Sequence, residues 1–229
     1  LLLTRICIDA LGPAIDAWRQ IMIFAALASI ALGAIAAYGQ TNIKRLLAYS
    51  SINNVGFALI GLAAGGAAGA SSVLFYMTVY VVMTLGAFLC VLRMRDANSE
   101  PVETLASLSG LSQSRPGLAA AIAIFMFSLA GIPPLLGFWP KVVVFQAAID
   151  AGLVWVAVAG FLGSVIGADY YIKIVKILYF DAPAAPFAKA RAPVESGLIL
   201  LAALAVSPLG YLAIGPIGTL ADKAAATLL

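Results

Sequence analysis

The sequence predicts an all-α polytopic membrane protein, and three observations lead to this fold class. Of its 229 residues, 63% are hydrophobic and only 10% are charged. Its mean hydropathy of +1.07 is far outside the range of soluble domains. The apolar residues fall into runs of about 20, which at ~1.5 Å per residue cover a hydrocarbon core of roughly 30 Å. About six complete transmembrane helices are expected.

The first residues look like the end of a helix already under way, because residues 1–8 begin with Leu-Leu-Leu-Thr-Arg and no methionine. We therefore expect the C-terminal part of a longer protein, with no signal peptide visible. A loop over 9–19 is expected to lead into the first complete span, from Ile21 to Tyr38.

Five more spans are expected along the chain. They lie from the basic turn 41–45 to about 62, then at 73–92, 117–148, 153–180 and 194–217. Small residues predict a loop over 61–72. The longest polar segment, 93–115, is expected to include a short helix from about Glu103. The tail from Gly218 is mildly amphipathic, and we expect it to lie at the membrane interface.

The span over 117–148 is interrupted by Gly-Ile-Pro-Pro-Leu-Leu-Gly-Phe-Trp-Pro, and Lys141 directly after it is the only charge of the span. Pro133 and Pro134 lack backbone N–H donors and clash with the preceding turn, so nearby carbonyl groups lose their helical partners. In a membrane, unpaired backbone is tolerated only beside protein or a water-filled cavity. We therefore expect one discontinuous helix with a hydrated break.

Lys141 is the first candidate for chemistry. A charged lysine at mid-membrane costs roughly 2.5–3.5 kcal/mol on insertion scales. Burial favours the neutral amine, whereas a nearby anion or water favours the charged form. A lysine balanced between these effects can gain and lose a proton as its surroundings change. The alternative is a structural lysine that extends its amine to the interface, roughly 10 Å away along the helix.

Two asparagines, Asn53 and Asn54, lie well inside the second complete span. Buried amides in membrane helices commonly form hydrogen bonds between helices. These two could instead hold water in a polar path that leads to Lys141. Both interpretations stay open.

Asp169 and Lys44 are further candidates, each with a structural alternative. Asp169 precedes Lys173 by four residues, which suits a local ion pair on a helix. It could instead be a carboxylate at one end of a proton path. Lys44 lies with Arg45 at a membrane boundary, where basic residues ordinarily mark topology.

The basic residues divide unevenly between the two sides of the expected spans. One side collects nine, which are Lys44, Arg45, Arg93, Arg95, Arg115, Lys173, Lys176, Lys189 and Arg191. The other side collects Arg5, Arg19 and Lys223. Because basic residues accumulate in cytoplasmic loops, we expect the first group in the cytoplasm and the C-terminus on the opposite side.

Several kinds of site find no support in the sequence. The chain has no histidine, and its two cysteines, Cys7 and Cys90, are far apart. There is no cysteine cluster for an iron–sulfur centre and no glycine-rich nucleotide fingerprint. No redox centre is therefore expected in this chain.

Two motifs resemble those of a known family, the antiporter-like membrane subunits of respiratory complex I, the NADH–quinone oxidoreductase. The segment 40–52, Gln-Thr-Asn-Ile-Lys-Arg-Leu-Leu-Ala-Tyr-Ser-Ser-Ile, resembles a signature at the start of one of their helices. The interrupted segment 128–141 resembles their broken helix, and 163–180 is similar to the helix that follows it. The resemblance covers nearly the whole chain.

The resemblance implies how the chain is organised and which residues act. It implies the second five-helix inverted repeat of an antiporter-like fold. The tail of a preceding helix would occupy 1–8, the repeat 9–180, and the final helix with the C-terminal tail 181–229. Lys141 would be the proton-transfer lysine, and Lys44 could join a chain of charges between subunits. Many relatives have a histidine at the place of Asn54, so a titratable relay is absent there.

The resemblance also implies partners and location. No cofactor is expected in this chain, because NADH, FMN, the iron–sulfur clusters and quinone would lie on partner subunits. The expected partners are other membrane-arm subunits and the lipid bilayer, with no nucleic acid. The expected location is the bacterial inner membrane, crossed several times, with a periplasmic C-terminus.

The function that follows is proton translocation through Lys141 beside the broken helix, driven by redox chemistry in other subunits. The chain would then be a translocase subunit. One alternative is a subunit of a multi-subunit cation/proton antiporter, and another is a non-conducting membrane scaffold. Co-purification with NADH dehydrogenase activity, or independent cation transport, separates the first two.

Overall fold

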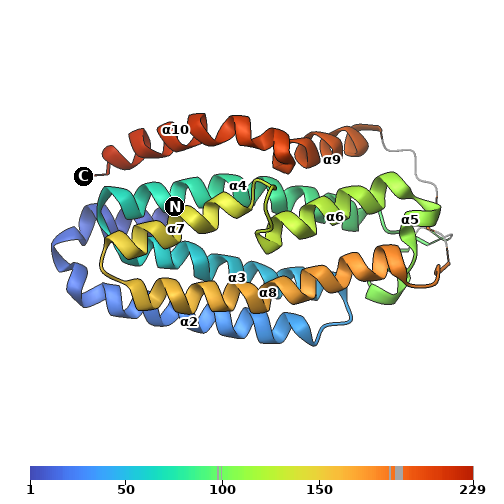
Figure 1. Cartoon of the computed structure of the whole chain (residues 1–229), viewed down its shortest axis with the longest axis horizontal. Helices are drawn as coiled ribbons and strands as arrows, with labels where there is room; N and C mark the ends of the chain where they lie inside the picture. Colours follow the sequence, from blue (N-terminus) through green and yellow to red (C-terminus); the bar gives the residue numbers. More distant parts are fainter. Residues whose placement is uncertain (97, 99, 186, 189–192, 229) are drawn as a thin grey trace.

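The computed structural model describes residues 1–96, 98, 100–185, 187–188 and 193–228, and it places them in a bundle of long helices running side by side (Figure 1). Within these residues, four helices are each long and apolar enough to cross a membrane. They are α2 (Ile15–Tyr38), α3 (Ile43–Ala64), α4 (Gly66–Leu92) and α8 (Val154–Phe180). The predicted all-α membrane fold is confirmed.

Two pairs of shorter helices occupy the places of the other two predicted spans. The predicted discontinuous helix consists of α6 (Pro116–Ala130) and α7 (Phe138–Asp150). The last span consists of α9 (Pro193–Val206) and α10 (Ile214–Ala226), joined through a 3₁₀ helix over Pro208–Ala213 and bent by 66°. By length and composition, the described residues hold four helices that could cross a membrane, or five when the bent α9–α10 pair is counted as one span. Helices α6 and α7 occupy the place of the predicted discontinuous span.

The predicted loop over 9–19 is too long, because helix α2 already begins at Ile15. The short helix α1 (Leu2–Arg5) and two further helical turns precede it. Arg19, which we expected in the loop, lies on α2 and donates hydrogen bonds to the carbonyl groups of Ala63 (3.0 Å) and Ala64 (3.3 Å). These carbonyls at the end of α3 are acceptors for the Arg19 guanidinium. Arg19 can therefore lie within α2 rather than in a loop before it.

The predicted small-residue loop over 61–72 is wrong. Helix α3 continues to Ala64, and α4 starts two residues later, after Gly65 with φ of 77°. The small residues serve close packing instead, since a Cβ on Gly69 would lie 2.7 Å from the carbonyl oxygen of Gly61.

The predicted interfacial tail from Gly218 is also wrong. This segment is the second half of α10, which runs beside α4 in the bundle (Figure 1). Ala221 and Ala225 on α10 are buried, and Asp222 accepts a hydrogen bond of 2.5 Å from Ser71 on α4. Because Pro208 follows the end of α9, a second helix completes this span.

The polar segment 93–115 folds back onto the turn between α2 and α3. It contains a 3₁₀ helix over Leu105–Leu108 and the short helix α5 (Leu111–Ser114), close to the helix expected from Glu103. The Ile43 N–H donates to the carbonyl of Glu103, and the Leu105 N–H donates to the carbonyl of Thr41, both at 2.8 Å. This end of the bundle is therefore closed by backbone hydrogen bonds.

The two ends of the bundle differ in charge. The chain begins and ends at the same end of the bundle, and the α2–α3 turn and α5 lie at the other (Figure 1). Of the nine basic residues assigned to the second end, Lys189 and Arg191 lie outside the described residues.

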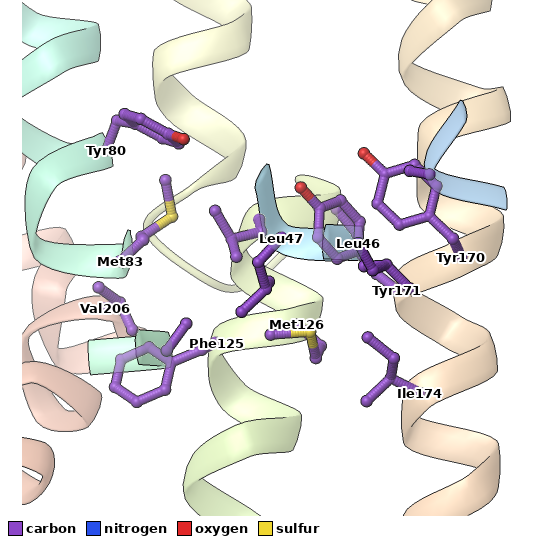
Figure 2. Close-up of a cluster of buried hydrophobic side chains, with 14 of the residues drawn as sticks. Leu46, Leu47, Tyr80, Met83, Phe125, Met126, Tyr170, Tyr171, Ile174 and Val206 are labelled. Carbon is purple, nitrogen blue, oxygen red and sulfur yellow. The ribbon is translucent and has the colours of Figure 1, made fainter. Parts of the chain in front are cut away.

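The core of the bundle joins helices that are far apart in sequence. Leu46 and Leu47 of α3, Met83 of α4, Tyr171 of α8 and Val206 of α9 belong to one cluster of buried side chains (Figure 2). This cluster encloses the polar groups described next, so they are positioned by packed helices rather than by loops.

Candidate proton-transfer site

The break between α6 and α7 leaves backbone groups that find partners elsewhere in the protein. Pro134 has no N–H, so the Ala130 carbonyl lacks the donor that would follow it by four residues in a helix. The Gly137 N–H donates to the Ser128 hydroxyl at 3.1 Å, and the Leu136 N–H donates to the carbonyl of Val206 at 3.0 Å. The break is thus an ordered structure.

Lys141 takes the carbonyl that the break leaves free. Its Nζ donates to the Ala130 carbonyl oxygen and to the Ser164 hydroxyl on α8, both at 2.8 Å. It also lies 5.0 Å from the centre of the Phe57 ring on α3, which favours a cation. The lysine is only 7% exposed. Its amine therefore points into the bundle and does not extend to the interface.

Two glycines make this arrangement sterically feasible. Gly131 ends α6 with φ of 81°, and a Cβ there would lie 2.9 Å from Cδ of Lys141. A Cβ on Gly137 would lie 2.0 Å from the carbonyl oxygen of Ser128. Larger residues at these positions would push the lysine or the break out of place.

A second group of buried polar side chains, which we call the polar cluster, consists of Ser50, Asn54, Tyr76 and Tyr171. Tyr76 donates to Oδ1 of Asn54 at 2.9 Å, and Nδ2 of Asn54 donates to the Tyr171 hydroxyl at 3.0 Å. The hydroxyls of Ser50 and Tyr171 also share a hydrogen bond. The cluster joins α3, α4 and α8 through groups that both donate and accept hydrogen bonds.

The polar cluster lies on the same helix faces as the groups around Lys141. On α3, Asn54 comes three residues before Phe57, and on α8, Tyr171 comes seven residues after Ser164. Seven residues are two helical turns, or about 10 Å. Both offsets lead toward the basic end of the bundle. No hydrogen bond among the described residues joins the amine directly to the cluster.

The two asparagines have different surroundings. The side chain of Asn53 donates to the Ile30 carbonyl of α2 at 2.9 Å, which is the helix-packing contact we considered for it. Asn54 belongs to the polar cluster, on the face toward α8. Pro133 and Pro134 lie on the exposed side of the break.

Asp169 and Lys173 do not form the expected ion pair. Both side chains are exposed, and no contact within 4.0 Å joins them in the described structure. Lys173 instead lies over the Tyr38 ring, with its Nζ 5.6 Å from the ring centre. Asp169 points away from the buried face of α8 that carries Ser164.

Lys44 lies at the basic end of the bundle and pairs with Glu103. Its Nζ is 2.6 Å from Oε1 of Glu103, and Nδ2 of Asn42 donates to the other carboxylate oxygen at 2.9 Å. The hydrogen bonds from Lys44 and Asn42 lower the pKa of the Glu103 carboxyl. Lys44 therefore helps to hold the polar segment against α3.

Sequence reasoning missed Ser164, Tyr76 and Tyr171 as site residues. One signal could have found two of them, because Ser164 and Tyr171 stand seven residues apart on a face of α8 that also carries Gly160, Gly163 and Gly167. A glycine-lined helix face is one that packs closely, so polar groups on it face the protein.

No group of three or more side chains suited to hold a metal ion is found among the described residues. The polar groups around the site are an amine, hydroxyls and amides. An amine can take up and release a proton, whereas hydroxyls and amides donate and accept hydrogen bonds.

The chain belongs to the family described as NADH:quinone oxidoreductase/Mrp antiporter, transmembrane region. The model of this family matches residues 1–167, which reach from the chain start to the middle of α8. The resemblance seen in the sequence motifs is confirmed.

Curated relatives of this chain are named NADH-quinone oxidoreductase subunit N. The protein of Rhizorhabdus wittichii is 68% identical over 93% of this chain and 44% of its own length. That of Sphingopyxis alaskensis is 57% identical over 99% of this chain and 48% of its own length. The chain thus spans about half the length of the curated relatives it matches.

Solved structures agree with this assignment. A chain of respiratory complex I from Thermus thermophilus is 30% identical, with a TM-score of 0.74 over 86% of this chain and 45% of its own length. A chain of the Mrp complex from Dietzia sp. matches with a TM-score of 0.78 over 92% of this chain and 47% of its own. At 22% identity the second match shows a shared fold only.

Proposed function

We propose that this chain is the C-terminal half of a membrane-arm subunit of a proton-translocating NADH–quinone oxidoreductase in the bacterial inner membrane. Other subunits of the complex would carry NADH, FMN, the iron–sulfur clusters and quinone. Residues 9–180 would form its second five-helix repeat. The names of the relatives support this proposal.

We infer that Lys141 is the residue that takes up and releases protons. The observation that carries this inference is the position of its amine, buried and held by Ala130 and Ser164 with no carboxylate partner among the described residues. About 14 Å of α7 separate Lys141 from Asp150, and about 21 Å of α6 separate Ala130 from Pro116. The amine thus lies deep in a core of roughly 30 Å.

Neutral oxygen acceptors leave such an amine free to change its charge. A buried lysine paired with a carboxylate would be fixed in the charged form, because losing its proton would leave the anion unpaired. A carbonyl and a hydroxyl instead accept hydrogen bonds from either form of the amine. The polar cluster would serve as the next station toward the basic end of the bundle, which we assign to the cytoplasm. The C-terminus would then be periplasmic.

The test of the assigned function is to isolate the full-length subunit from its native membrane through an affinity tag. We expect NADH-driven quinone reduction to co-purify with it, and vesicles containing the complex to acidify when NADH is added. Cation exchange by the isolated subunit without NADH would instead support the antiporter alternative. A preparation that oxidises NADH equally well and pumps equally well without this subunit would support the scaffold alternative.

A further inference from the structure

The break in the last span meets the break that carries Lys141. The Leu136 N–H, inside the first break, donates to the carbonyl of Val206, the last residue of α9, at 3.0 Å. The rings of Trp139 and Tyr211 pack edge to face with their centres 6.0 Å apart. Leu136 is 4% exposed and Val206 is fully buried, so this contact is closed to solvent.

Both partners of the backbone hydrogen bond are groups that a continuous helix would not leave free. Along an unbroken last helix the Gly210 N–H would bond to Val206, but it donates to the Ser207 carbonyl at 2.8 Å. Pro208 has no N–H, and the Ser207 hydroxyl takes its place at the Leu204 carbonyl, at 2.7 Å. The last span therefore offers a spare acceptor where the first break offers a spare donor.

The contact also depends on a glycine. A Cβ at Gly210 would lie 2.1 Å from the Ala205 carbonyl oxygen and 3.1 Å from Cδ2 of Leu136. A larger residue would therefore displace the backbone of the second break, and the end of the Leu136 side chain would have to give way by a few tenths of an ångström. In an apolar surrounding a separated N–H and carbonyl would each be left without a hydrogen-bond partner, which is unfavourable, so the contact is held firmly.

This contact lies directly before the lysine in the chain. Leu136 is two residues before the start of α7, Trp139 is in its first turn, and Lys141 follows two residues later. A shift of Leu136 and Trp139 therefore moves the whole first turn of α7. The two 2.8 Å hydrogen bonds of the amine tolerate only a few tenths of an ångström before they weaken.

We propose that the break in the last span positions Lys141, through the Val206 carbonyl and the Tyr211 ring as positioning groups. The last helix is then part of the proton-transfer site rather than a peripheral anchor. This inference rests on the proposed role of Lys141 in proton transfer.

The test replaces Tyr211 in the full-length subunit within its complex. Tyr211→Leu removes the ring that packs on Trp139, and Tyr211→Phe keeps it. Leu212→Ala is the matched control, because Leu212 is in the same 3₁₀ helix and is 81% exposed. We expect Tyr211→Leu to slow NADH-driven proton pumping by at least about tenfold, since misplacing a reacting group by 1 Å can cost on the order of 100-fold.

The pH profile of pumping separates positioning from general damage. We expect Tyr211→Leu to move the pH at which pumping is half-maximal, while Tyr211→Phe and Leu212→Ala keep the native rate and profile. Pro208→Ala provides a second route, because the restored N–H favours a continuous helix and draws the Gly210 N–H back to Val206. It should reproduce the displaced profile even if Tyr211→Leu assembles poorly.

Two results would overturn this inference. One is native pumping and a native pH profile in both Tyr211→Leu and Pro208→Ala, measured beside a Lys141→Ala complex that does not pump. The other is equal loss in Tyr211→Phe and Leu212→Ala, which would mean general damage to the segment. Normal pumping by Lys141→Ala would instead refute the proposed function itself.

Discussion

The surroundings of the Lys141 amine are set by residues from several helices. Lys141 has a carbonyl, a hydroxyl and an aromatic ring around its amine, and each comes from a different helix. The carbonyl of Ala130 is available only because Pro134 cannot donate to it. The role of the lysine therefore depends on Ser164 as much as on its own position.

The first prediction concerns Ser164→Ala. The change removes one of the two acceptors of the Lys141 amine, and a hydrogen bond to a charged group is worth about 1.5–3 kcal/mol. We expect pumping to slow by on the order of 10-fold, since about 1.4 kcal/mol corresponds to a tenfold change in rate. The measurement is the initial rate of NADH-driven acidification of reconstituted vesicles.

Ser72→Ala is the matched control for this prediction. Ser72 is also a buried serine, on α4, and its hydroxyl donates to the Gly69 carbonyl of the same helix, at 2.7 Å. Equal rates in the two variants would show that Ser164 has no special part in the site.

The second prediction concerns Glu103, whose pKa is lowered by the hydrogen bonds from Lys44 and Asn42. A lowered pKa means that the folded state holds the charged carboxylate more strongly than the unfolded state does. The pair therefore stabilises the protein above the ordinary pKa of a glutamate, and this stabilisation is lost as the pH falls through the lowered value. The effect is small, because both side chains are partly exposed.

This prediction is checked with Glu103→Gln, by comparing thermal unfolding midpoints of the solubilised protein with the native one across the acidic range. We expect the variant to be slightly less stable at neutral pH and the difference to vanish in acid. A difference that grows in acid would contradict the sign.

At the scale of helices, the two breaks solve the same problem with different sequences. In each, proline removes an N–H donor, and a serine hydroxyl then replaces part of the lost hydrogen bonding, Ser128 in the first and Ser207 in the second. What remains is shared between them, because Leu136 donates to Val206. A membrane interior allows interrupted helices only when every loose backbone group finds such a partner.

The third prediction concerns the prolines of the first break. Pro134→Ala restores the N–H that would bond to the Ala130 carbonyl in a helix, so it competes directly with Lys141 for that oxygen. Combined with Pro133→Ala it should favour a straight helix, since each proline costs ~3 kcal/mol in a helix interior. We expect a complex that assembles but moves fewer protons per electron.

The measurement for this double variant is the proton-to-electron ratio in reconstituted vesicles, alongside the subunit content of the complex. Normal subunit content with an unchanged ratio would mean that the break is not needed for the site.

Some of these helices and contacts could be predicted from the sequence, and others could not. The interrupted span was predictable, because Pro-Pro within an apolar run has one physical consequence and Lys141 stands directly after it. The loop expected over 61–72 was wrong, because glycine, alanine and serine mark either a turn or a close helix contact, and tertiary packing decides between them. The meeting of Leu136 with Val206 was not predictable, because no local pattern reports a contact between residues 70 positions apart in the chain.

At the scale of the whole molecule, the bundle has a basic end and an end that holds both chain termini (Figure 1). The polar cluster and Lys44 lie toward the basic end, whereas α7 runs from the break toward the other. A lysine between two such ends could exchange protons with both, which is what transport across a membrane requires.

The fourth prediction concerns orientation, and it follows from the excess of lysine and arginine at one end. Cysteines placed at Ala106 and Ala224, both exposed, should react with an impermeant reagent from opposite sides, with Ala106 cytoplasmic. Ser99, in the same polar segment, would be another position for the cytoplasmic cysteine, but it lies outside the described residues. The native Cys7 and Cys90 are buried and should give little background. Reaction of both sites from one side would show that a span has been miscounted.

The most direct test of the account is the proton-to-electron ratio of a complex that carries Lys141→Ala. Lys223→Ala, which removes an exposed lysine of α10, is the control, and Lys141→Arg keeps the charge but does not readily release a proton. We expect full assembly in all three, a sharply reduced ratio in Lys141→Ala, partial loss in Lys141→Arg and a native ratio in Lys223→Ala. An assembled Lys141→Ala complex with the native ratio would contradict the account.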